Sequence, residues 1–386
     1  MNYQELAKKY GTPFYIFDIE KLKKRIKYLK DYLGFDIDLV YAVKANTFLI
    51  PYIYQDVEKL ELCSFGEYEI AKTSKVPASK MVISGVYKNE REIRQMLEED
   101  VPDKFTIESL NQFYLLDKLS LEYQKKLNVI LRYTSGSQFG MSKSDIKEIL
   151  ETKSTNLKIK GIQYFSKTQR HSIPILEKEL IKINEFMEEL EKEFNIVLEE
   201  FEYGPGFPVY YFLNDEFLED EFLTEFNRIL KNIKNKKVSI ELGRSIAASC
   251  GEYITKVVDI KTNKTGNYAI VDGGINHLVY YGGNMGIRVP QHEIIPSRRG
   301  DNSYIICGAL CTINDILVKE LKVSKFEVGD LLIFKNTGAY APFEGISLFL
   351  SRELPKAIIK NKNELHVVRE SFKTSKLNSP EVKGEC

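Results

Sequence analysis

A lysine at the end of an apolar run is the first residue whose setting suggests chemistry. Lys44 directly follows the run Leu39–Val43 and precedes Ala45-Asn46. If this run is a β-strand, partial burial at its end favours the neutral amine, which can form a Schiff base with a carbonyl compound. The common alternative for a single lysine is that its stem packs while its charged head reaches water.

A Gly-Pro-Gly segment is the second candidate. Gly204-Pro205-Gly206 follows the β-rich run Glu200–Tyr203. Glycines expose backbone N–H groups with little steric cover, which suits a phosphate. A sharp turn from strand to helix is the alternative for such a segment. Thr168, after the run Ile159–Phe165, could add a hydroxyl to the same phosphate site or could cap a helix.

A Glu-x-Gly-Arg segment is the third candidate. Glu241, Gly243 and Arg244 close the run Ser239–Leu242. Gly243 gives access to the backbone, and Arg244 supplies positive charge for a phosphate. The loops after the seventh and eighth strands of a parallel barrel frequently form a phosphate site. We therefore expect Glu241 to lie near the middle of a ligand held there.

Two further segments in the last third of the chain carry reactive side chains. Cys311 and Asp315 place a thiol and a carboxylate four residues apart in a turn. Most free cysteines are small buried apolar residues, which is the alternative for Cys311. Tyr340 follows Gly338-Ala339, and its phenol could reach a phosphate or simply pack.

The elements that position these residues alternate between strand and helix. Short β-rich runs are separated by helical patterns, such as 176–193, where apolar residues recur every three or four positions. Eight such runs over about 200 residues predict a (β/α)₈ barrel, whose active site lies at the carboxyl ends of the strands. An open doubly wound sheet is the alternative. The predicted strands are 39–43, 60–63, 81–84, 105–107, 129–133, 159–165, 200–203 and 239–242.

After residue 245 the pattern changes to β-rich runs separated by Gly, Asn and Asp turns. This predicts a C-terminal antiparallel β-sandwich or β-barrel domain. We expect residues 1–18 to contribute an N-terminal strand to that domain, 19–245 to form the barrel, 246–370 to form the β domain, and 371–386 to be a flexible tail.

Composition excludes several classes of protein. Lys plus Arg number 55 and Asp plus Glu number 55, so no broad cationic surface for nucleic acid or membrane is expected. No apolar run is long enough to span a bilayer, and no secretory signal is visible. Five scattered cysteines and four isolated histidines predict neither disulfides nor a metal site. We expect a cytoplasmic enzyme without a metal.

The joint order of these segments resembles the fold-type III pyridoxal-phosphate decarboxylases, the family of the ornithine and diaminopimelate decarboxylases. The resemblance covers nearly the whole chain, and the lysine motif combined with Glu-x-Gly-Arg is specific to it. It implies an alanine racemase-like barrel, pyridoxal 5′-phosphate as cofactor, and decarboxylation through a Schiff base and a quinonoid intermediate. It also implies a homodimer whose two subunits build each active site together.

The resemblance implies a role for each candidate residue. Lys44 would hold the cofactor aldehyde, and Glu241 would face the pyridine nitrogen, where the related racemases place an arginine. Cys311 would be the proton donor after carbon dioxide leaves, and with Thr312 and Asp315 it would meet the substrate from the second subunit. The remaining cofactor-binding residues would be Phe165, which stacks on the ring, and Thr168, Gly204, Gly206, Gly243, Arg244 and Tyr340.

Three departures from the family pattern concern the substrate. Phe165 replaces a histidine, Thr312 replaces the acidic residue that recognises a distal amine, and an expected arginine is missing from residues 272–280. The amino-acid sequence of these segments is most similar to that of a subgroup in natural-product pathways that decarboxylates a glutamyl group tethered to a carrier protein. A free diamino acid, of the diaminopimelate, ornithine or lysine type, is the alternative substrate. A non-catalytic protein that binds the cofactor is a third possibility, which the retained Lys44 and Cys311 disfavour.

Overall fold

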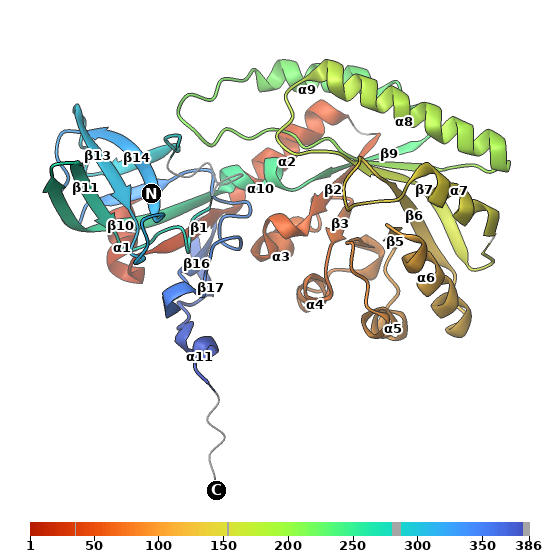
Figure 1. Cartoon of the computed structure of the whole chain (residues 1–386), viewed down its shortest axis with the longest axis horizontal. Coiled ribbons are helices and arrows are strands. Elements are labelled where there is room, and N and C mark those ends of the chain that lie inside the picture. The colour runs from red at the N-terminus through yellow and green to blue at the C-terminus, as the bar shows by residue number, and fades with distance from the viewer. Residues whose placement is uncertain (35, 153, 280–286, 381–386) are drawn as a thin grey trace, which may run out of the picture. The chain divides into compact units, whose positions relative to one another are not determined.

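The computed structural model describes residues 1–34, 36–152, 154–279 and 287–380. The chain forms two compact units. The barrel unit comprises residues 23–208 and 217–246, and the sheet unit comprises residues 1–22, 209–216 and 247–386 (Figure 1). Within the described ranges, no helix is both long enough and apolar enough to cross a membrane.

Eight parallel strands close the barrel of the barrel unit, in the order in which they occur along the chain. This confirms the predicted (β/α)₈ barrel, and each strand lies within two residues of its predicted bounds. The strands are β2 (Ile37–Ala42), β3 (Lys59–Leu62), β4 (Met81–Ile83), β5 (Lys104–Ile107), β6 (Leu127–Tyr133), β7 (Leu157–Phe165), β8 (Glu200–Gly204) and β9 (Lys237–Leu242). Its longer helices are α2 (Ile19–Leu33), α4 (Phe65–Thr73), α5 (Glu90–Glu99), α6 (Leu110–Glu122), α7 (Lys143–Thr152), α8 (Ile173–Phe194) and α9 (Glu219–Leu230).

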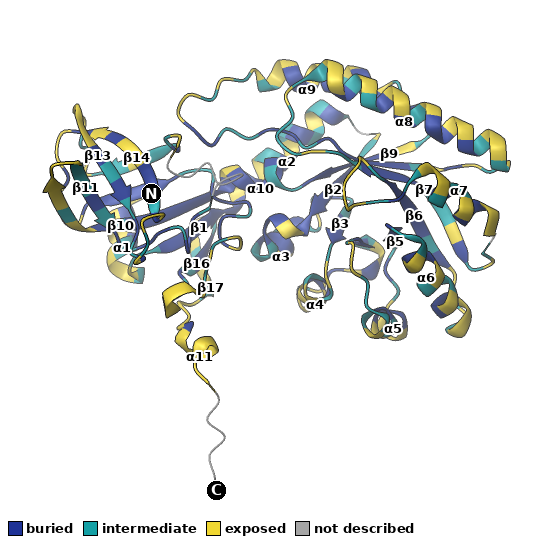
Figure 2. Cartoon of the chain, in the orientation of Figure 1, coloured by how far each residue is buried: buried dark blue, intermediate teal, exposed yellow. Residues whose placement is uncertain are grey.

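Alternation along the strands separates two environments. On β8, Phe201 and Tyr203 stack on each other, and Tyr203 stacks on Phe226 of α9, so these rings lie between sheet and helix. Residues 200 and 202 therefore face the barrel interior. The helices match this arrangement, since α8 buries residues three or four positions apart and exposes the opposite face (Figure 2).

The sheet unit contains a nine-stranded mixed sheet among the described residues. Most neighbouring strands are antiparallel, as predicted, but β1 pairs with β16 and β11 pairs with β13 in parallel. The strands are β1 (Phe14–Asp18), β10 (Gly251–Asn263), β11 (Gly266–Val271), β12 (His292–Ile295), β13 (Asn302–Cys307), β14 (Ile316–Val323), β15 (Leu331–Phe334), β16 (Lys356–Asn361) and β17 (Glu364–Arg369).

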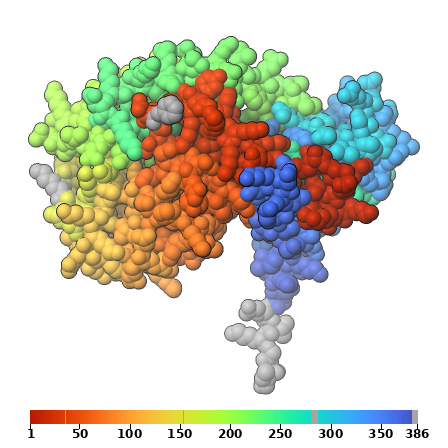
Figure 3. Space-filling view, turned by 180° about the vertical axis from the view of Figure 1, so that it is seen from behind, coloured from red at the N-terminus to blue at the C-terminus, as the bar shows by residue number. Residues whose placement is uncertain are grey.

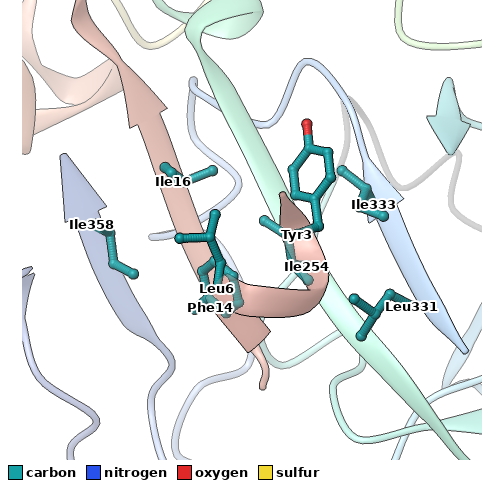
Figure 4. Close-up of a cluster of buried hydrophobic side chains, with 8 residues drawn as sticks. All are labelled: Tyr3, Leu6, Phe14, Ile16, Ile254, Leu331, Ile333 and Ile358. Atoms are coloured by element: carbon teal, nitrogen blue, oxygen red, sulfur yellow. The ribbon is translucent and has the colours of Figure 1, made fainter. Parts of the chain in front are cut away.

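The N-terminal strand lies inside this sheet. β1 is fully buried and pairs with β10 on one side and β16 on the other. Helix α1 (Tyr3–Tyr10) covers it, and Tyr3 and Leu6 pack with Phe14, Ile16, Ile254, Leu331, Ile333 and Ile358 (Figure 4). Accordingly, the first residues of the chain lie directly against its last strands in the space-filling view (Figure 3).

Parts of the chain differ from the expected domain organisation. Residues 19–22 and 209–216 belong to the sheet unit, although both were expected in the barrel. The segment from residue 371, expected to be a flexible tail, is held over residues 371–380, because Phe372 pairs with Leu354 and the Thr374 hydroxyl donates to the Arg352 carbonyl. It ends in the short helix α11 (Ser375–Asn378).

Candidate active site

Lys44 lies at the carboxyl end of the barrel strands, between two acidic side chains. The 3-10 turn η1 (Val43–Ala45) follows β2 and carries it. Lys44 Nζ lies 2.8 Å from Glu61 Oε2 and 3.4 Å from Glu241 Oε1. The lysine side chain is 41% exposed, whereas those of Glu61 and Glu241 are 2% and 6% exposed. A reactive amine therefore lies at the open end of the barrel, above two buried carboxyl groups.

The two carboxyl groups differ in proton affinity. Burial opposes ionisation of both, but at Glu61 the charge and hydrogen bond of Lys44, the hydrogen bond with Glu241 and the charge of Arg132 together outweigh it and lower the pKa of that carboxyl. Burial, followed by the negative charge of Glu61, raises the pKa of Glu241. The two side chains are hydrogen bonded to each other. The pair therefore holds one proton next to the lysine, with Glu241 as its favoured site.

Strand β7 contributes two residues to the same open end of the barrel, which we call the barrel mouth. Gln163 is buried, and its Nε2 donates to Glu241 Oε2 at 3.1 Å. Phe165 ends the strand and pairs in register with Gly204 of β8. A Cβ atom on Gly204 would lie 2.5 Å from Phe165 Cδ2, so the ring lies directly over the glycine. Only a residue without a side chain fits under this ring.

The loops after β7 and β8 are held together at Gly206. Gly206 has φ +66°, and a Cβ atom there would lie 2.0 Å from the Lys167 carbonyl oxygen and 2.8 Å from Thr168 Cα. The Arg170 backbone N–H donates to the Gly206 carbonyl at 2.9 Å. These contacts bring Thr168 and Gly206 together, as the predicted phosphate site requires.

Gly243 and Arg244 complete the barrel side of the site. A Cβ atom on Gly243 would lie 3.0 Å from Ala45 Cβ, so this glycine lets the end of β9 pack against the turn that carries Lys44. Arg244 is the first residue of the short helix α10 (Arg244–Ala247). The candidate residues from β2, β7, β8 and β9 thus all lie at the carboxyl ends of their strands.

The remaining candidate residues lie in the sheet unit. Cys311 is exposed in the turn between β13 and β14, and Thr312 follows it. Asp315, by contrast, is 2% exposed, and its carboxylate accepts from the Ile275 N–H at 2.8 Å and the Leu310 N–H at 2.7 Å. Its oxygens thus fasten the turn that carries Cys311, a position that fits a structural brace better than the predicted contact with substrate.

Tyr340 has an uncommon backbone conformation. Its φ is +64°, in the left-handed region that side chains larger than glycine rarely adopt. The backbone N–H groups of Phe343 and Glu344 both donate to its carbonyl, which holds the turn in this form. Such strain concentrates at functional sites, in agreement with the proposed role of its phenol.

Comparison with known proteins identifies the family. The family model described as "Pyridoxal-dependent decarboxylase, C-terminal sheet domain" matches residues 14–338. This chain belongs to the pyridoxal-dependent decarboxylases. The enzyme is thus a carboxy-lyase that uses pyridoxal phosphate, as the motifs predicted.

Several curated relatives are similar over nearly the whole decarboxylase. Diaminopimelate decarboxylase of Methanocaldococcus jannaschii is 26% identical, covering 95% of this chain and 90% of its own. The Campylobacter jejuni enzyme of the same name is 27% identical over 96% of each chain. The L-glutamyl-[BtrI acyl-carrier protein] decarboxylase of Niallia circulans is 25% identical, covering 94% of this chain and 92% of its own.

Solved structures share the fold of this decarboxylase. Diaminopimelate decarboxylase from M. jannaschii, in complex with L-lysine, superposes with a TM-score of 0.87 at 22% identity, covering 98% of this chain and 94% of that one. A lysine/ornithine decarboxylase from Vibrio vulnificus has a TM-score of 0.82 at 21% identity, covering 94% and 97%.

The barrel mouth fits pyridoxal phosphate. Lys44 presents an amine for the aldehyde, Glu241 a carboxyl for the ring nitrogen, and Phe165 a flat ring face. At Gly206 and Gly243 a side chain would press against the neighbouring loop or turn, so glycine lets these segments approach closely at the end of the barrel. Glycine-rich turns of this kind are suited to presenting backbone N–H groups to a phosphate.

Sequence reasoning missed two residues of this mouth, Glu61 and Gln163. Both lie on strands, two residues before a position at the strand end: Glu61 before Cys63, and Gln163 before Phe165. Period-two alternation on short strands was the available signal, since it places these polar side chains on the inner face with the candidate residues.

Proposed function

We propose that Lys44 holds pyridoxal phosphate at the barrel mouth and that the substrate is a free α-amino acid of the diamino type. The observation that carries the first part is the position of the Lys44 amine, 2.8 Å from Glu61 and 3.4 Å from Glu241, at the carboxyl end of the barrel. When bound, the cofactor supplies an aldehyde for an amine and a ring that accepts the electron pair released as carbon dioxide leaves.

The residues of this chain bind and orient that group. Glu241 holds a proton at its carboxyl for the ring nitrogen, and burial beside Glu61 favours this proton. Phe165 packs against the ring face, a contact that requires no hydrogen bond. Gly206, Thr168 and Arg244 hold the phosphate through backbone N–H, hydroxyl and guanidinium groups.

The relatives support a free diamino acid more strongly than the carrier-linked glutamyl group suggested by the motifs. Both diaminopimelate decarboxylases named above align over at least 95% of this chain. One residue favours the carrier-linked substrate as a second candidate: Thr312, next to Cys311, has no charge for a distal amine. Measuring carbon dioxide release separates the two candidates. Turnover of diaminopimelate, lysine or ornithine supports the first, and turnover of carrier-loaded glutamate alone overturns it.

The first test of the cofactor site is Lys44→Arg. The purified wild-type protein, incubated with pyridoxal phosphate, is expected to gain the visible absorption of a lysine-bound cofactor. The variant keeps a positive charge between Glu61 and Glu241 but has no amine that can add to the aldehyde, so this absorption is lost. Lys88→Arg, a change of a partly exposed lysine in the segment that follows β4, serves as control. A wild-type protein that takes up no cofactor contradicts the proposal.

We also propose that two copies of the chain form a dimer in which Cys311 of one copy serves the cofactor of the other. The turn of Cys311 is exposed, including Ile313 at 91%. Arg352 Nη2 donates to the Ala309 carbonyl at 2.8 Å, which joins this turn to a segment with exposed Ile346, Leu348 and Phe349. An apolar surface of this kind next to a catalytic thiol is suited to a partner subunit.

A further inference from the structure

Glu202 is a buried acid to which neither the family motifs nor the proposed mechanism gives a role. It lies on β8, and its side chain faces the barrel interior because Phe201 and Tyr203 face the helices. The residue is 1% exposed. Among the residues that the structure describes, neither Glu202 Oε1 nor Oε2 has a hydrogen-bond partner. Leaving an ionised carboxylate in this state would cost several kcal/mol.

Gln163, the register partner of Glu202 in the sheet, also has an oxygen without a hydrogen-bond donor among the described residues. Gln163 pairs with Glu202 in register across β7 and β8, and register partners present their side chains on the same face. The Gln163 amide donates through Nε2 to Glu241, but its Oε1 is buried and has no donor among the described residues. Three acceptor oxygens thus lie in one part of the barrel interior, and a single proton on Glu202 turns one of them into a donor.

We propose that Glu202 is held protonated and donates to Gln163 Oε1, directly or through a buried water, and so fixes the amide that positions Glu241. This inference rests on the proposed function, since it concerns the carboxyl that faces the cofactor nitrogen. Glu202 is a positioning residue: it acts on Glu241 through Gln163. An ionised Glu202 could only accept, so it would offer no donor to Gln163 Oε1 and would favour the flipped amide, whose Nε2 is turned away from Glu241.

The charges around Glu202 agree with a neutral acid. Lys104 donates to Glu200 and is therefore already paired. Burial raises the pKa of Glu202 from 4.5 to about 7; the positive charge of Lys104 opposes this rise, and the negative charge of Glu61 adds to it. The charged groups that face it from its own and the neighbouring elements are Lys44 of η1, Glu61 of β3, Lys104 of β5, Glu200 of β8 and Glu241 of β9.

The first measurement follows the unfolding of the protein without added cofactor against pH. Folded Glu202 keeps a proton that the unfolded chain releases near pH 4.5, so its contribution to stability is complete below that pH and is lost as the pH rises through about 7. Glu202→Gln has the same shape and no proton to lose, so the fall in melting temperature between these pH values becomes shallower. Glu221→Gln, on the exposed face of α9, is the matched control. An unchanged pH profile in Glu202→Gln overturns the protonated state.

The second measurement tests the positioning of Glu241. Glu202→Gln retains a donor for Gln163 and should bind pyridoxal phosphate within about twofold of wild type, whereas Glu202→Leu and Gln163→Leu should each bind about tenfold more weakly, as expected for one lost buried hydrogen bond. Wild-type affinity in both leucine variants overturns the link to Glu241. If Glu202→Leu does not fold, Gln163→Leu decides alone. Failure of the wild type to bind cofactor contradicts the proposed function, while the pH measurement remains decisive for Glu202.

Discussion

At the scale of single residues, the proposed function gives Cys311 and Lys44 separable tasks. Lys44 lies in the barrel unit and Cys311 in the sheet unit, and in the proposal the lysine amine joins the cofactor. The exposed thiol is proposed to donate a proton and not to hold the ring. Variants at the two positions should therefore differ in spectrum as well as in rate.

Cys311→Ala is expected to retain the visible absorption of the bound cofactor and to lose turnover. A proton donor contributes about 10²–10⁴-fold to rate, so kcat should fall by about 100-fold or more. The measurement is carbon dioxide release together with an absorption spectrum of the same sample. Cys307→Ala, at the end of β13, controls for the loss of a nearby thiol. A colourless Cys311→Ala protein would show that the thiol helps to hold the cofactor.

Individual site residues could be predicted from the sequence where they end a strand. Lys44 and Glu241 lie at such ends and have reactive side chains, so both their position and their residue type indicated a functional site. For Glu61, Gln163 and Glu202 the period-two alternation of their strands was only a weak signal, because a polar side chain in a short strand is usually solvated. Only closure of the barrel places them in a buried interior.

The paired loops after β7 and β8 are the elements on which the proposed phosphate site depends. Gly206 allows them to meet, because its φ is +66° and no atom separates it from the Lys167 carbonyl and Thr168 Cα. An added methyl group would push the loops apart and would also strain the backbone by about 1–2 kcal/mol.

Gly206→Ala is thus expected to weaken pyridoxal phosphate binding by about tenfold or more, equivalent to about 1.4 kcal/mol, because the added methyl group would part the two loops proposed to hold the phosphate. Gly136→Ala is the matched control: it also has a positive φ of +99°, but a Cβ atom there meets nothing within 4 Å. Titration of the protein with cofactor, followed by absorbance, gives both affinities. Equal losses in the two variants would mean that strain, and not the contact with Lys167 and Thr168, limits binding.

Helices and strands could be predicted from the sequence most readily where their burial follows a regular pattern. The barrel strands are mostly apolar and alternate with amphipathic helices, so their order and number could be read directly. In the sheet unit the local signal is weaker, because strands such as β14 and β17 have many exposed positions and carry charged residues such as Lys319, Glu320 and Lys322. Their strand conformation comes from pairing with neighbours and not from local preference.

For the whole molecule, the proposed dimer predicts that two inactive variants restore each other. Lys44→Ala and Cys311→Ala proteins should each show little activity alone. If they are unfolded, mixed in equal amounts and refolded, half of the dimers contain both chains, and each of these has one intact site, so about a quarter of wild-type activity returns. Matching mixtures of either variant with itself are the controls. No recovery in a mixture shown to contain mixed dimers contradicts a shared site.

The position of β1 in the sheet has a consequence for synthesis of the chain. Asp18 at its end bonds to Lys360, 342 residues further on. At a ribosomal rate of about 5–20 residues per second, β1 waits roughly 20–70 s for the strand beside it. During this time the barrel can close while a largely apolar strand lacks at least one of its two partner strands, β10 and β16, on the nascent chain. Chaperones that shield early segments should therefore matter more for the yield of this enzyme than the stability of the finished fold suggests.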